Sequence, residues 1–283
     1  MARQILGAPL AQALSEQLGQ KCKSLQCCGI NPKLVIVRFG EQPGDIAYER
    51  GIIKTFRPIG IEVETIALPP DAPVEELLST FRTLSKDSGV HGILPMRPFP
   101  RQIDDALARN AIPPEKDMDG VCDASLTGLF TGIQTGYAPC TAQACMALLE
   151  QENVPLDGCR ATVVGRSLVI GKPVGMLLMQ KNATVTYAHS HTRDLASVTR
   201  DADVLIVAAG KRGLVGREHV SPSQIVLDVG MHYDEHGNLT GDVRYDEVFD
   251  VVAAITPTRG GVGAVTSCIL ASHVVESAEK SLS

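Results

Sequence analysis

The sequence predicts an α/β protein built from two domains. The chain has 283 residues, which is about the length of two domains. Short β-branched runs alternate with amphipathic stretches in two separate series, and such alternation is typical of parallel sheets covered by helices. Hydrophobic residues make up 44% and charged residues 20% of the chain. This composition is that of a globular protein and excludes a disordered or fibrous one.

The first series occupies residues 8–95. Its expected elements, in order, are a helix over 8–25, a strand over 33–38, a helix over 44–57, a strand over 61–66, a helix over 74–84 and a strand over 91–95. Apolar residues three and four apart indicate the helices, and β-branched runs indicate the strands. Pro58 and Gly60 are expected to end the second helix at Arg57.

A second series follows an irregular segment over residues 97–141. Five prolines interrupt that segment, which contains one helical piece over 104–110, and a loop this long in a compact domain is usually functional. The second series predicts a doubly wound domain. Its expected elements are a helix over 142–152, a strand over 160–164, a helix over 173–181, a strand over 183–187, a further helix, and strands over 203–209, 224–229 and 251–255, before a last helix over 267–280.

The charge and composition of the chain narrow its partners. The net charge of -6 gives no general attraction to nucleic acid or to anionic membranes. Aromatic residues make up only 4% of the chain and Trp is absent, so a platform for stacking nucleic-acid bases is not expected. The longest apolar runs fall short of the roughly 18 residues of a membrane span. We therefore expect neither nucleic acid nor a membrane as a partner.

The N-terminal residues and the cysteines predict a cytoplasmic protein. The first twenty residues lack the unbroken apolar stretch and cleavage pattern of a secretion signal. The 8 cysteines are scattered, without a C-x-x-C motif or a paired framework, in a chain too long to depend on disulfides. Reduced thiols are therefore expected.

A glycine-containing turn between a strand and a helix suggests a nucleotide site. In the segment 163–173, backbone N–H groups and the start of a helix could face a pyrophosphate. The spacing differs from G-x-G-x-x-G, because Ser167 and Ile170 occupy the second and third glycine positions after Gly165. From this loop alone, a plain strand-to-helix turn is about as well supported as a dinucleotide site.

The end of the next strand favours NADP over NAD. Enzymes that select NAD place an acidic residue about 20 residues after the glycine turn, where it binds the ribose 2′-hydroxyl. Here the segment 187–193 contains hydroxyls, histidines and an arginine, and no acidic residue precedes Asp194. Together with Arg166, these groups suit a 2′-phosphate. His189 and His191 could instead ligate a metal, but two histidines without a third ligand are more often surface residues, so no metal is expected.

Several motifs, taken in order, resemble the bifunctional methylenetetrahydrofolate dehydrogenase/methenyltetrahydrofolate cyclohydrolase family. The most specific stretches are 114–120 (PEKDMDG), 139–141 (PCT), 165–173 (GRSLVIGKP), 182–190, 228–230 (DVG) and 255–263 (ITPTRGGVG). The resemblance covers nearly the whole chain. It implies a substrate (folate) domain over residues 1–140, completed by the C-terminal helix 267–283, and a Rossmann-like NADP-binding domain over 141–266, with a cleft between them.

The resemblance also implies roles for single residues. The residues expected to contact NADP are Gly165, Arg166, Ser167, Ser190 and Met231, and those expected to contact the folate are Tyr48, Ile52, Met96, Asp119, Gly260 and Gly261. Asp119 is the carboxylate that would bind the pterin, where it can accept two hydrogen bonds. Tyr48 would pack on the aminobenzoyl ring. From the residues alone, Asp119 reads as a turn residue before Gly120, and Tyr48 as a half-buried helix residue.

Two positions depart from the family pattern. The family carries Tyr-x-x-x-Lys on one helix face, and its lysine is catalytic, but the residue four after Tyr48 is Ile52. The family's glutamine falls on Met96. Lys54 lies about 120° around the helix from Tyr48, whereas Ile52 lies about 40° away. Replacing both members of a polar pair by apolar groups can be nearly neutral for stability.

The combined expectation is an enzyme that oxidises 5,10-methylenetetrahydrofolate with NADP as a homodimer. Tyr48, Asp119 and Lys54 are its candidate catalytic residues. Because hydrolysis needs a positioned polar or basic group and hydride transfer mainly needs alignment, we expect cyclohydrolase activity to be weak or absent. A shifted helix that brings Lys54 or Arg97 into the site would restore it. Two competing hypotheses are a catalytically silent folate- and NADP-binding paralogue and a Rossmann dehydrogenase acting on a small acid.

Overall fold

The computed structural model describes residues 2–282, which form two compact units. Unit 1 comprises residues 2–11 and 141–266, and unit 2 comprises residues 12–140 and 267–282. We expected the first domain to begin at residue 1, whereas residues 2–11 belong to unit 1. The reason is a short strand, β1 (Arg3–Gln4), which pairs in parallel with β11 (Ala254–Ile255) of that unit.

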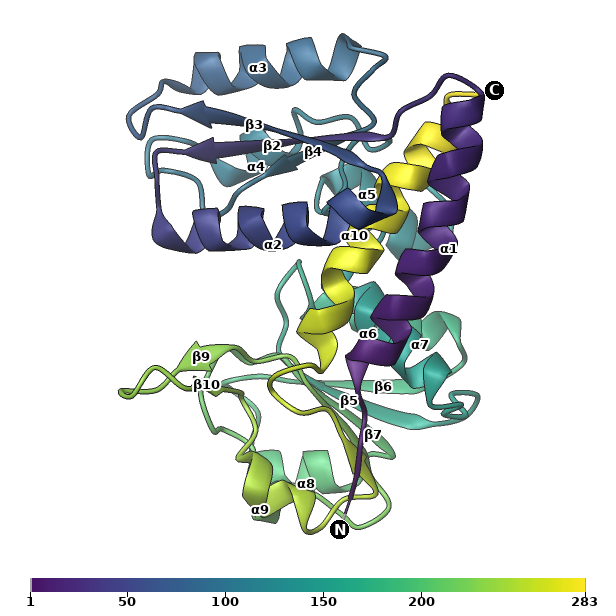
Figure 1. Ribbon diagram of the computed structural model, residues 1–283. Helices are drawn as coiled ribbons and strands as arrows, with labels where there is room; N and C mark the ends of the chain where they lie inside the picture. The colour runs from purple at the N-terminus through teal and green to yellow at the C-terminus, as the bar shows by residue number, and fades with distance from the viewer. Residues whose placement is uncertain (1, 283) are drawn as a thin grey trace. The chain divides into compact units, whose positions relative to one another are not determined.

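Unit 2 is built on a three-stranded parallel sheet in the order β3-β2-β4. Its strands are β2 (Lys33–Phe39), β3 (Glu62–Leu68) and β4 (Gly92–Pro95), and its flanking helices are α2 (Pro43–Ile59) and α3 (Val74–Lys86). Figure 1 shows α2 and α3 on opposite faces of this sheet. Residues 34–37 of the central strand are fully buried, since both faces of β2 are covered. The expected β-α-β-α-β pattern is thus confirmed.

The helix α2 continues two residues beyond its expected end at Arg57. Pro58 lies inside its last turn, and the helix ends where Gly60 adopts the left-handed conformation at φ 93°. The N–H of Gly60 donates to the carbonyls of Phe56 and Arg57, which satisfies two groups at the end of the helix. Glycine adopts this conformation without a steric penalty, so Gly60 ends the helix and Pro58 does not.

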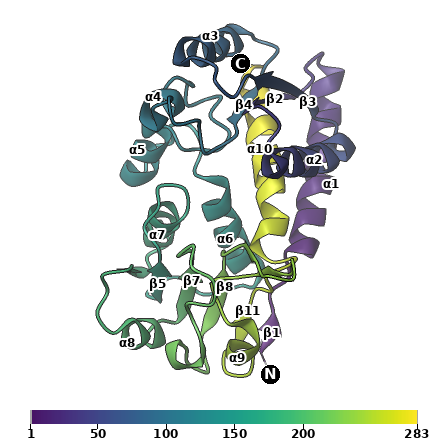
Figure 2. The same cartoon turned by 90° about the vertical axis from the view of Figure 1, so that its left-hand side faces the viewer.

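The remaining helices of unit 2 include one that the sequence did not predict. Residues 12–27 of α1 (Gly7–Cys27) and 267–280 of α10 (Val262–Lys280) lie side by side (Figures 1 and 2), and Lys21 forms an ion pair with Glu279 at 3.0 Å. The short helix α4 (Asp105–Arg109) matches the expected helical piece. The helix α5 (Asp123–Thr131) was expected to be irregular; its N-cap is Cys122, an unusual capping residue.

Unit 1 contains a six-stranded parallel sheet in the order β1-β11-β8-β7-β5-β6. Its longer strands are β5 (Arg160–Val164), β6 (Thr184–Ala188), β7 (Val204–Val207) and β8 (Ile225–Asp228), and its helices include α6 (Cys140–Gln151), α7 (Gly171–Gln180), α8 (Leu195–Arg200) and α9 (Tyr245–Phe249). Figure 2 shows most of this strand order directly, with α7 and α8 on opposite faces. The expected doubly wound arrangement is confirmed.

A small antiparallel hairpin extends from unit 1 and was not predicted. Its strands are β9 (His232–Tyr233) and β10 (Leu239–Thr240), joined through a turn in which the Asp234 carboxylate accepts N–H bonds from His236 and Asn238. Strands of two residues fall below the length at which alternation can be read from a sequence.

Two global features bear on the expected environment of the chain. Among residues 2–282, none of the helices combines the length and the apolar character needed to cross a membrane. All eight cysteines are free thiols, and six of them are buried.

Candidate functional site

A cavity of about 430 Å³ opens at the carboxyl ends of three strands of unit 1. Its lining residues follow β5, β6 and β7: Val164, Gly165, Arg166, Ser167, His189, Ser190, Thr192, Leu195, Ala208, Ala209, Lys211 and Leu214. β5 lies between β7 and β6, so the chain reverses its direction of progress across the sheet at β5. In doubly wound sheets, ligands bind at the carboxyl ends of the strands at such a switch point.

Glycines in the loop between β5 and α7 allow close approach of the backbone. A Cβ on Gly165, at φ 133°, would lie 2.2 Å from the carbonyl oxygen of Ala208, and a Cβ on Gly171 would lie 2.4 Å from that of Gly165. The Ser167 hydroxyl accepts the N–H of Ile170 at 3.1 Å, which folds the loop onto the start of α7. Gly171 therefore allows close backbone packing, as a glycine of G-x-G-x-x-G does, but it lies at a different spacing from the first glycine.

A third glycine packs the helix α7 against the sheet. A Cβ on Gly175 would lie 2.1 Å from the hydroxyl of Tyr187 on β6, and this hydroxyl donates to the carbonyl of Lys172 at 3.0 Å. Close contact between the first helix and the sheet is the function of the last glycine in dinucleotide-binding motifs. In the sequence, the signal for this packing is the set of glycines at positions 165, 171 and 175, which replaces the G-x-G-x-x-G spacing.

The charges around this cavity fit a phosphorylated nucleotide. Arg166 and Lys211 are the cations among its lining residues, which include no Asp or Glu. Ser190 lines it from the end of β6, where the Thr192 hydroxyl accepts the N–H of His189 at 2.8 Å. Within residues 2–282 no group of three or more His, Cys, Asp or Glu side chains could hold a metal ion, and His189 instead lines the cavity.

One expected cofactor residue lies outside the lining of this cavity. Met231 follows Gly230 beyond β8, is 71% exposed, and does not line the hollow that Gly165 and Ser190 share. Sequence reasoning missed Ala208, Ala209 and Lys211, which line the cavity from the end of β7. The available signal was their place directly after a buried strand, where ligand-binding residues of parallel sheets are found.

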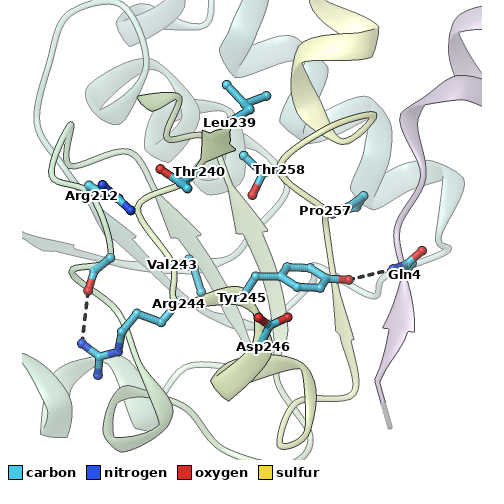
Figure 3. Close-up of a pocket in the computed structure, with 12 residues that line it drawn as sticks. Gln4, Arg212, Leu239, Thr240, Val243, Arg244, Tyr245, Asp246, Pro257 and Thr258 are labelled. Carbon is cyan, nitrogen blue, oxygen red and sulfur yellow. Dashed lines mark hydrogen bonds between the residues drawn. The ribbon is translucent and has the colours of Figure 1, made fainter. Parts of the chain in front are cut away.

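A second hollow of about 430 Å³ lies in unit 1 (Figure 3). Its lining includes Arg212 and Gly213 of the loop that follows β7, the hairpin residue Thr240, and Pro257 and Thr258 beyond β11. The hydroxyl of Tyr245 accepts a hydrogen bond from the side-chain amide of Gln4 at 2.9 Å across one end of it. None of the residues expected to contact the cofactor or the folate lines this hollow.

Tyr48 and Asp119 form a second candidate site, in unit 2. Burial raises the pKa of Tyr48 above its ordinary value, and the negative charges of Asp119 and, to a smaller extent, Cys140 raise it further. The phenol therefore stays protonated. The Tyr48 residue nevertheless keeps 42% of its surface exposed, which leaves the ring open to a ligand. Burial, with the charge of Asp117, raises the pKa of Asp119 to about 6, while Arg97 acts in the opposite direction.

Asp117 fixes the loop that carries Asp119. Its two carboxylate oxygens accept the N–H groups of Gly120 at 3.1 Å and Cys122 at 2.8 Å, and the second oxygen also accepts the hydroxyl of Ser125 at 3.2 Å. Asp117 is 1% exposed, so these bonds lie in the protein interior. A buried carboxylate with three donors holds the loop rigidly. The sequence analysis did not identify this role.

The two apolar positions are buried, whereas Lys54 is not. Ile52 has no exposed surface and Met96 has 4%, so both pack into unit 2. Lys54 is exposed on α2. The Arg97 guanidinium donates to a carboxylate oxygen of Asp105 at 3.0 Å through Nε and at 2.5 Å through Nη2. Arg97, not Lys54, is thus the cation whose charge acts on Asp119.

The last two expected folate residues belong to unit 1. Gly260 lies at φ 83°, and its carbonyl accepts the N–H of Gly7 at 2.7 Å. A Cβ on Gly261 would lie 2.4 Å from the carbonyl oxygen of Pro257, so a side chain is excluded there. The structure therefore brings Tyr48, Asp119 and Arg97 together in unit 2 and places the glycine pair in the other unit.

These features define a dinucleotide-binding α/β protein. Comparison with known proteins gives the family. Residues 5–119 match the catalytic domain and residues 139–282 match the NAD(P)-binding domain of the tetrahydrofolate dehydrogenase/cyclohydrolase family models. The chain belongs to this family, as its sequence motifs suggested.

Relatives match over almost the whole chain. The bifunctional protein FolD of Clostridioides difficile (strain 630) is 43% identical over 96% of this chain and 95% of its own length. The crystal structure of the bifunctional methylenetetrahydrofolate dehydrogenase/cyclohydrolase from Campylobacter jejuni matches with a TM-score of 0.97 at 34% identity, covering 99% of both chains. The Trypanosoma brucei dehydrogenase-cyclohydrolase, solved with NADP cofactor and an inhibitor, matches with a TM-score of 0.93 at 32% identity over 99% of this chain and 98% of that one.

Proposed function

We propose that this protein oxidises 5,10-methylenetetrahydrofolate to 5,10-methenyltetrahydrofolate with NADP+ in folate one-carbon metabolism. The observation that carries the proposal is the full-length family match of a chain that has a phosphate-compatible cavity at the ends of β5, β6 and β7. The relative with 43% identity is named a bifunctional protein, and the one with 34% identity is named a bifunctional methylenetetrahydrofolate dehydrogenase/cyclohydrolase. When bound, NADP+ supplies the hydride acceptor.

The cofactor would be held mainly by the loop after β5. The backbone of Gly165 and Ser167 would face the pyrophosphate at the start of α7. Arg166 and Ser190 would bind the 2′-phosphate, because this part of the cavity offers a cation and a hydroxyl without an opposing acid. Met231 is assigned to the cofactor through the family resemblance, and its exposure leaves it accessible to a ligand.

The folate would be oriented by Asp119 and Tyr48. Within residues 2–282 the Asp119 carboxyl has no hydrogen-bond partner in the protein, so both oxygens are available to the 2-amino group and ring N–H of a pterin. The exposed ring of Tyr48 would stack on the aminobenzoyl group. Gly260 and Gly261 would contact the substrate through their backbone, since neither carries a side chain.

Weak or absent cyclohydrolase activity is the second part of the proposal. Attack of water on the methenyl carbon needs a positioned polar or basic group. Ile52 and Met96, at the positions of the family's lysine and glutamine, are buried and apolar, and Lys54 is exposed. One observation favours cyclohydrolase activity instead: the charge of Arg97 acts on Asp119. A bifunctional enzyme would then use Arg97 rather than Lys54.

One assay separates these possibilities. NADPH formation and methenyltetrahydrofolate decay are followed independently in the wild type, Lys54→Ala, Arg97→Gln and Asp119→Ala. We expect the wild type to form NADPH and to accumulate methenyltetrahydrofolate. We expect Asp119→Ala to lose NADPH formation. Hydrolysis as fast as formation in the wild type would contradict the cyclohydrolase part, and loss of that hydrolysis in Arg97→Gln or Lys54→Ala would identify the responsible cation. Ligand binding without NADPH formation would indicate a silent paralogue.

Three further assignments are proposed with this function. Residues 12–140 with the C-terminal residues 267–282 are proposed as the folate domain, and residues 2–11 with 141–266 as the NADP domain. The protein is proposed to be a homodimer, which light scattering of the purified chain would test. The reduced state of its eight cysteines supports a cytoplasmic location.

A further inference from the structure

The loop after β7 lies between two hollows. Ala208, Ala209, Lys211 and Leu214 line the cofactor cavity, and Arg212 and Gly213 line the second hollow of Figure 3. Ala209 and Leu214 pack against the hydrophobic core of unit 1, whereas residues 210–212 between them are exposed. Gly210, at φ 64°, adds a residue with high backbone freedom. Hydrogen bonds are therefore expected to fix the exposed middle of this loop, residues 208–214.

A single buried carboxylate provides two of these bonds. One oxygen of Asp242 accepts the N–H of Ala209 at 2.7 Å and the N–H of Gly210 at 2.9 Å. The Asp242 side chain has no exposed surface, so water does not compete for these donors. Hydrogen bonds to a charged group are stronger than neutral ones, and the effect increases where water is excluded.

The other oxygen of Asp242 binds His232 of the hairpin. His232 Nε2 lies 2.7 Å from this oxygen, and the His232 side chain keeps 24% of its surface exposed. The imidazole thus satisfies the remaining acceptor and fixes the carboxylate in one orientation. Met231, a residue assigned to the cofactor, directly precedes His232 in the chain.

Asp228 holds the backbone of Asp242 in place. Its carboxylate accepts the N–H groups of Asp242 and Val243, each at 3.1 Å, and that of Gly230 at 2.9 Å. A Cβ on Gly230 would lie 2.3 Å from the backbone nitrogen of Asp242, so this turn packs directly on the residue. The end of β8, the hairpin and the loop 208–214 are therefore joined through Asp242.

We propose that Asp242 and His232 are positioning residues for NADP: they fix the loop 208–214 as the wall of the cofactor cavity without touching the reacting atoms. This inference rests on the proposed function, because it assigns NADP to that cavity. Removing the bonds would let the loop sample other positions, and cofactor binding would have to restore order to it. The affinity for NADP would fall, while the rate of the bound enzyme would change little.

The test uses the full chain, with NADP+ as the titrated probe. Calorimetry is expected to give a Kd about tenfold higher for Asp242→Asn and a smaller increase for His232→Ala, since a charge-assisted bond contributes on the order of one tenfold step. His232→Gln keeps a donor at the same reach and is expected to restore affinity to within about twofold of the wild type. Asp234→Asn, which removes the same charge from the hairpin turn, is the matched control.

A second measurement reports on the loop without any ligand. Hydrogen exchange of the peptide that contains Ala209 and Gly210 should be about tenfold faster in Asp242→Asn and faster in His232→Ala, with the wild-type rate in Asp234→Asn. The kcat of each variant at saturating NADP+ should stay within about twofold of the wild type, because only cofactor affinity is affected. His232→Ala keeps the test decisive if Asp242→Asn does not fold, since His232 is partly exposed.

The outcomes are distinguishable. Wild-type protein that does not bind NADP+ overturns the proposed function, and the exchange measurement then decides on the loop alone. Wild-type protein that binds NADP+, together with His232→Ala that binds equally well and shows unchanged exchange, overturns the positioning role and leaves the proposed function intact. Equal losses of kcat and stability in His232→Ala and His232→Gln would also contradict it, because they would indicate general damage to the fold.

Discussion

Asp117 and Asp119 lie two residues apart in one loop of unit 2, and the charge of Asp117 acts on Asp119. Asp117 is 1% exposed and directs its oxygens to two backbone N–H groups and the hydroxyl of Ser125. Burial together with the charge of Asp117 raises the pKa of Asp119, the proposed pterin-binding residue, to about 6. The Asp117 carboxylate thus holds the loop through hydrogen bonds, and its charge also raises the pKa of Asp119.

The raised pKa of Asp119 predicts that folate binding weakens as the pH falls through about 6. The protonated carboxyl loses one of the acceptors that a pterin amino group and ring N–H require. Calorimetry between about pH 5 and 8, a range that spans the titration of Asp119, measures the affinity for a stable folate analogue. This affinity should decrease toward the acidic end. Asp119→Asn should bind weakly at every pH. A wild-type affinity that does not depend on pH would contradict the assignment.

The stability of the protein should change with pH in the opposite sense. Between the ordinary carboxyl pKa of 3.8 and about 6, the folded state binds more protons at Asp119 than the unfolded state does. The contribution of Asp119 to the free energy of unfolding should therefore rise as the pH falls through this window. Asp228, whose pKa burial also raises to about 6, contributes in the same direction. Urea unfolding gives the free energy of unfolding at each pH across this range. Its slope against pH should be smaller in Asp119→Asn than in the wild type, but not zero, because Asp228 still contributes.

Asp117→Ala should destabilise the protein by about 3 kcal/mol, because it leaves three buried donors without an acceptor. The donors are the N–H groups of Gly120 and Cys122 and the hydroxyl of Ser125. Asp123→Ala is the matched control: its side chain is 61% exposed, and its bonds to Arg109 and Asn110 lie at the surface. Surface pairs contribute less than about 1 kcal/mol. Equal effects in the two variants, measured by urea unfolding, would contradict the role of Asp117.

Much of the fold could be predicted because its long elements carry strong periodic signals. The strand β2 is a β-branched run that is buried on both faces, and α3 buries Leu77, Phe81 and Leu84 at helical spacing. The sequence did not predict β1, β9 and β10, which have two residues each: β1 pairs with the distant strand β11, and β9 pairs with β10 in a short hairpin. The helix α5 was missed because its cap is Cys122 rather than Ser, Thr, Asp or Asn.

The candidate site was predictable where a residue's role follows from its local motif. Gly165 and Ser167 lie in a turn that chain order alone places at the end of a strand. Asp242 could not be found in this way, because its partners Ala209 and Gly210 lie 33 and 32 residues away in sequence and contribute only backbone N–H groups. Such a bond depends on the tertiary arrangement and leaves no pattern of side chains to read.

Tyr48→Phe should keep the affinity for a folate analogue within about twofold, whereas Tyr48→Ala should lower it about tenfold. The aromatic ring carries the proposed stacking contact, and an aromatic pair contributes about 0.5–1.5 kcal/mol beyond the area it buries. The raised pKa of Tyr48 keeps the phenol neutral, so its replacement by Phe removes no charge. Tyr233→Ala, on the exposed hairpin of unit 1, serves as the control. A large loss in Tyr48→Phe would assign a direct role to the hydroxyl instead.

Gly165→Ala should abolish measurable NADP+ binding, whereas Gly51→Ala should raise the stability. At Gly165 the added Cβ would lie 2.2 Å from the carbonyl oxygen of Ala208, and φ is 133°, so the loop after β5 and the end of β7 would have to separate. At Gly51, in the exposed middle of α2, an added Cβ has no atom within 4 Å. Alanine there should add about 0.5–1 kcal/mol through its helix propensity. Calorimetry with NADP+ and urea unfolding of both variants measure these effects, and NADP+ binding by Gly165→Ala at wild-type strength would place the nucleotide elsewhere.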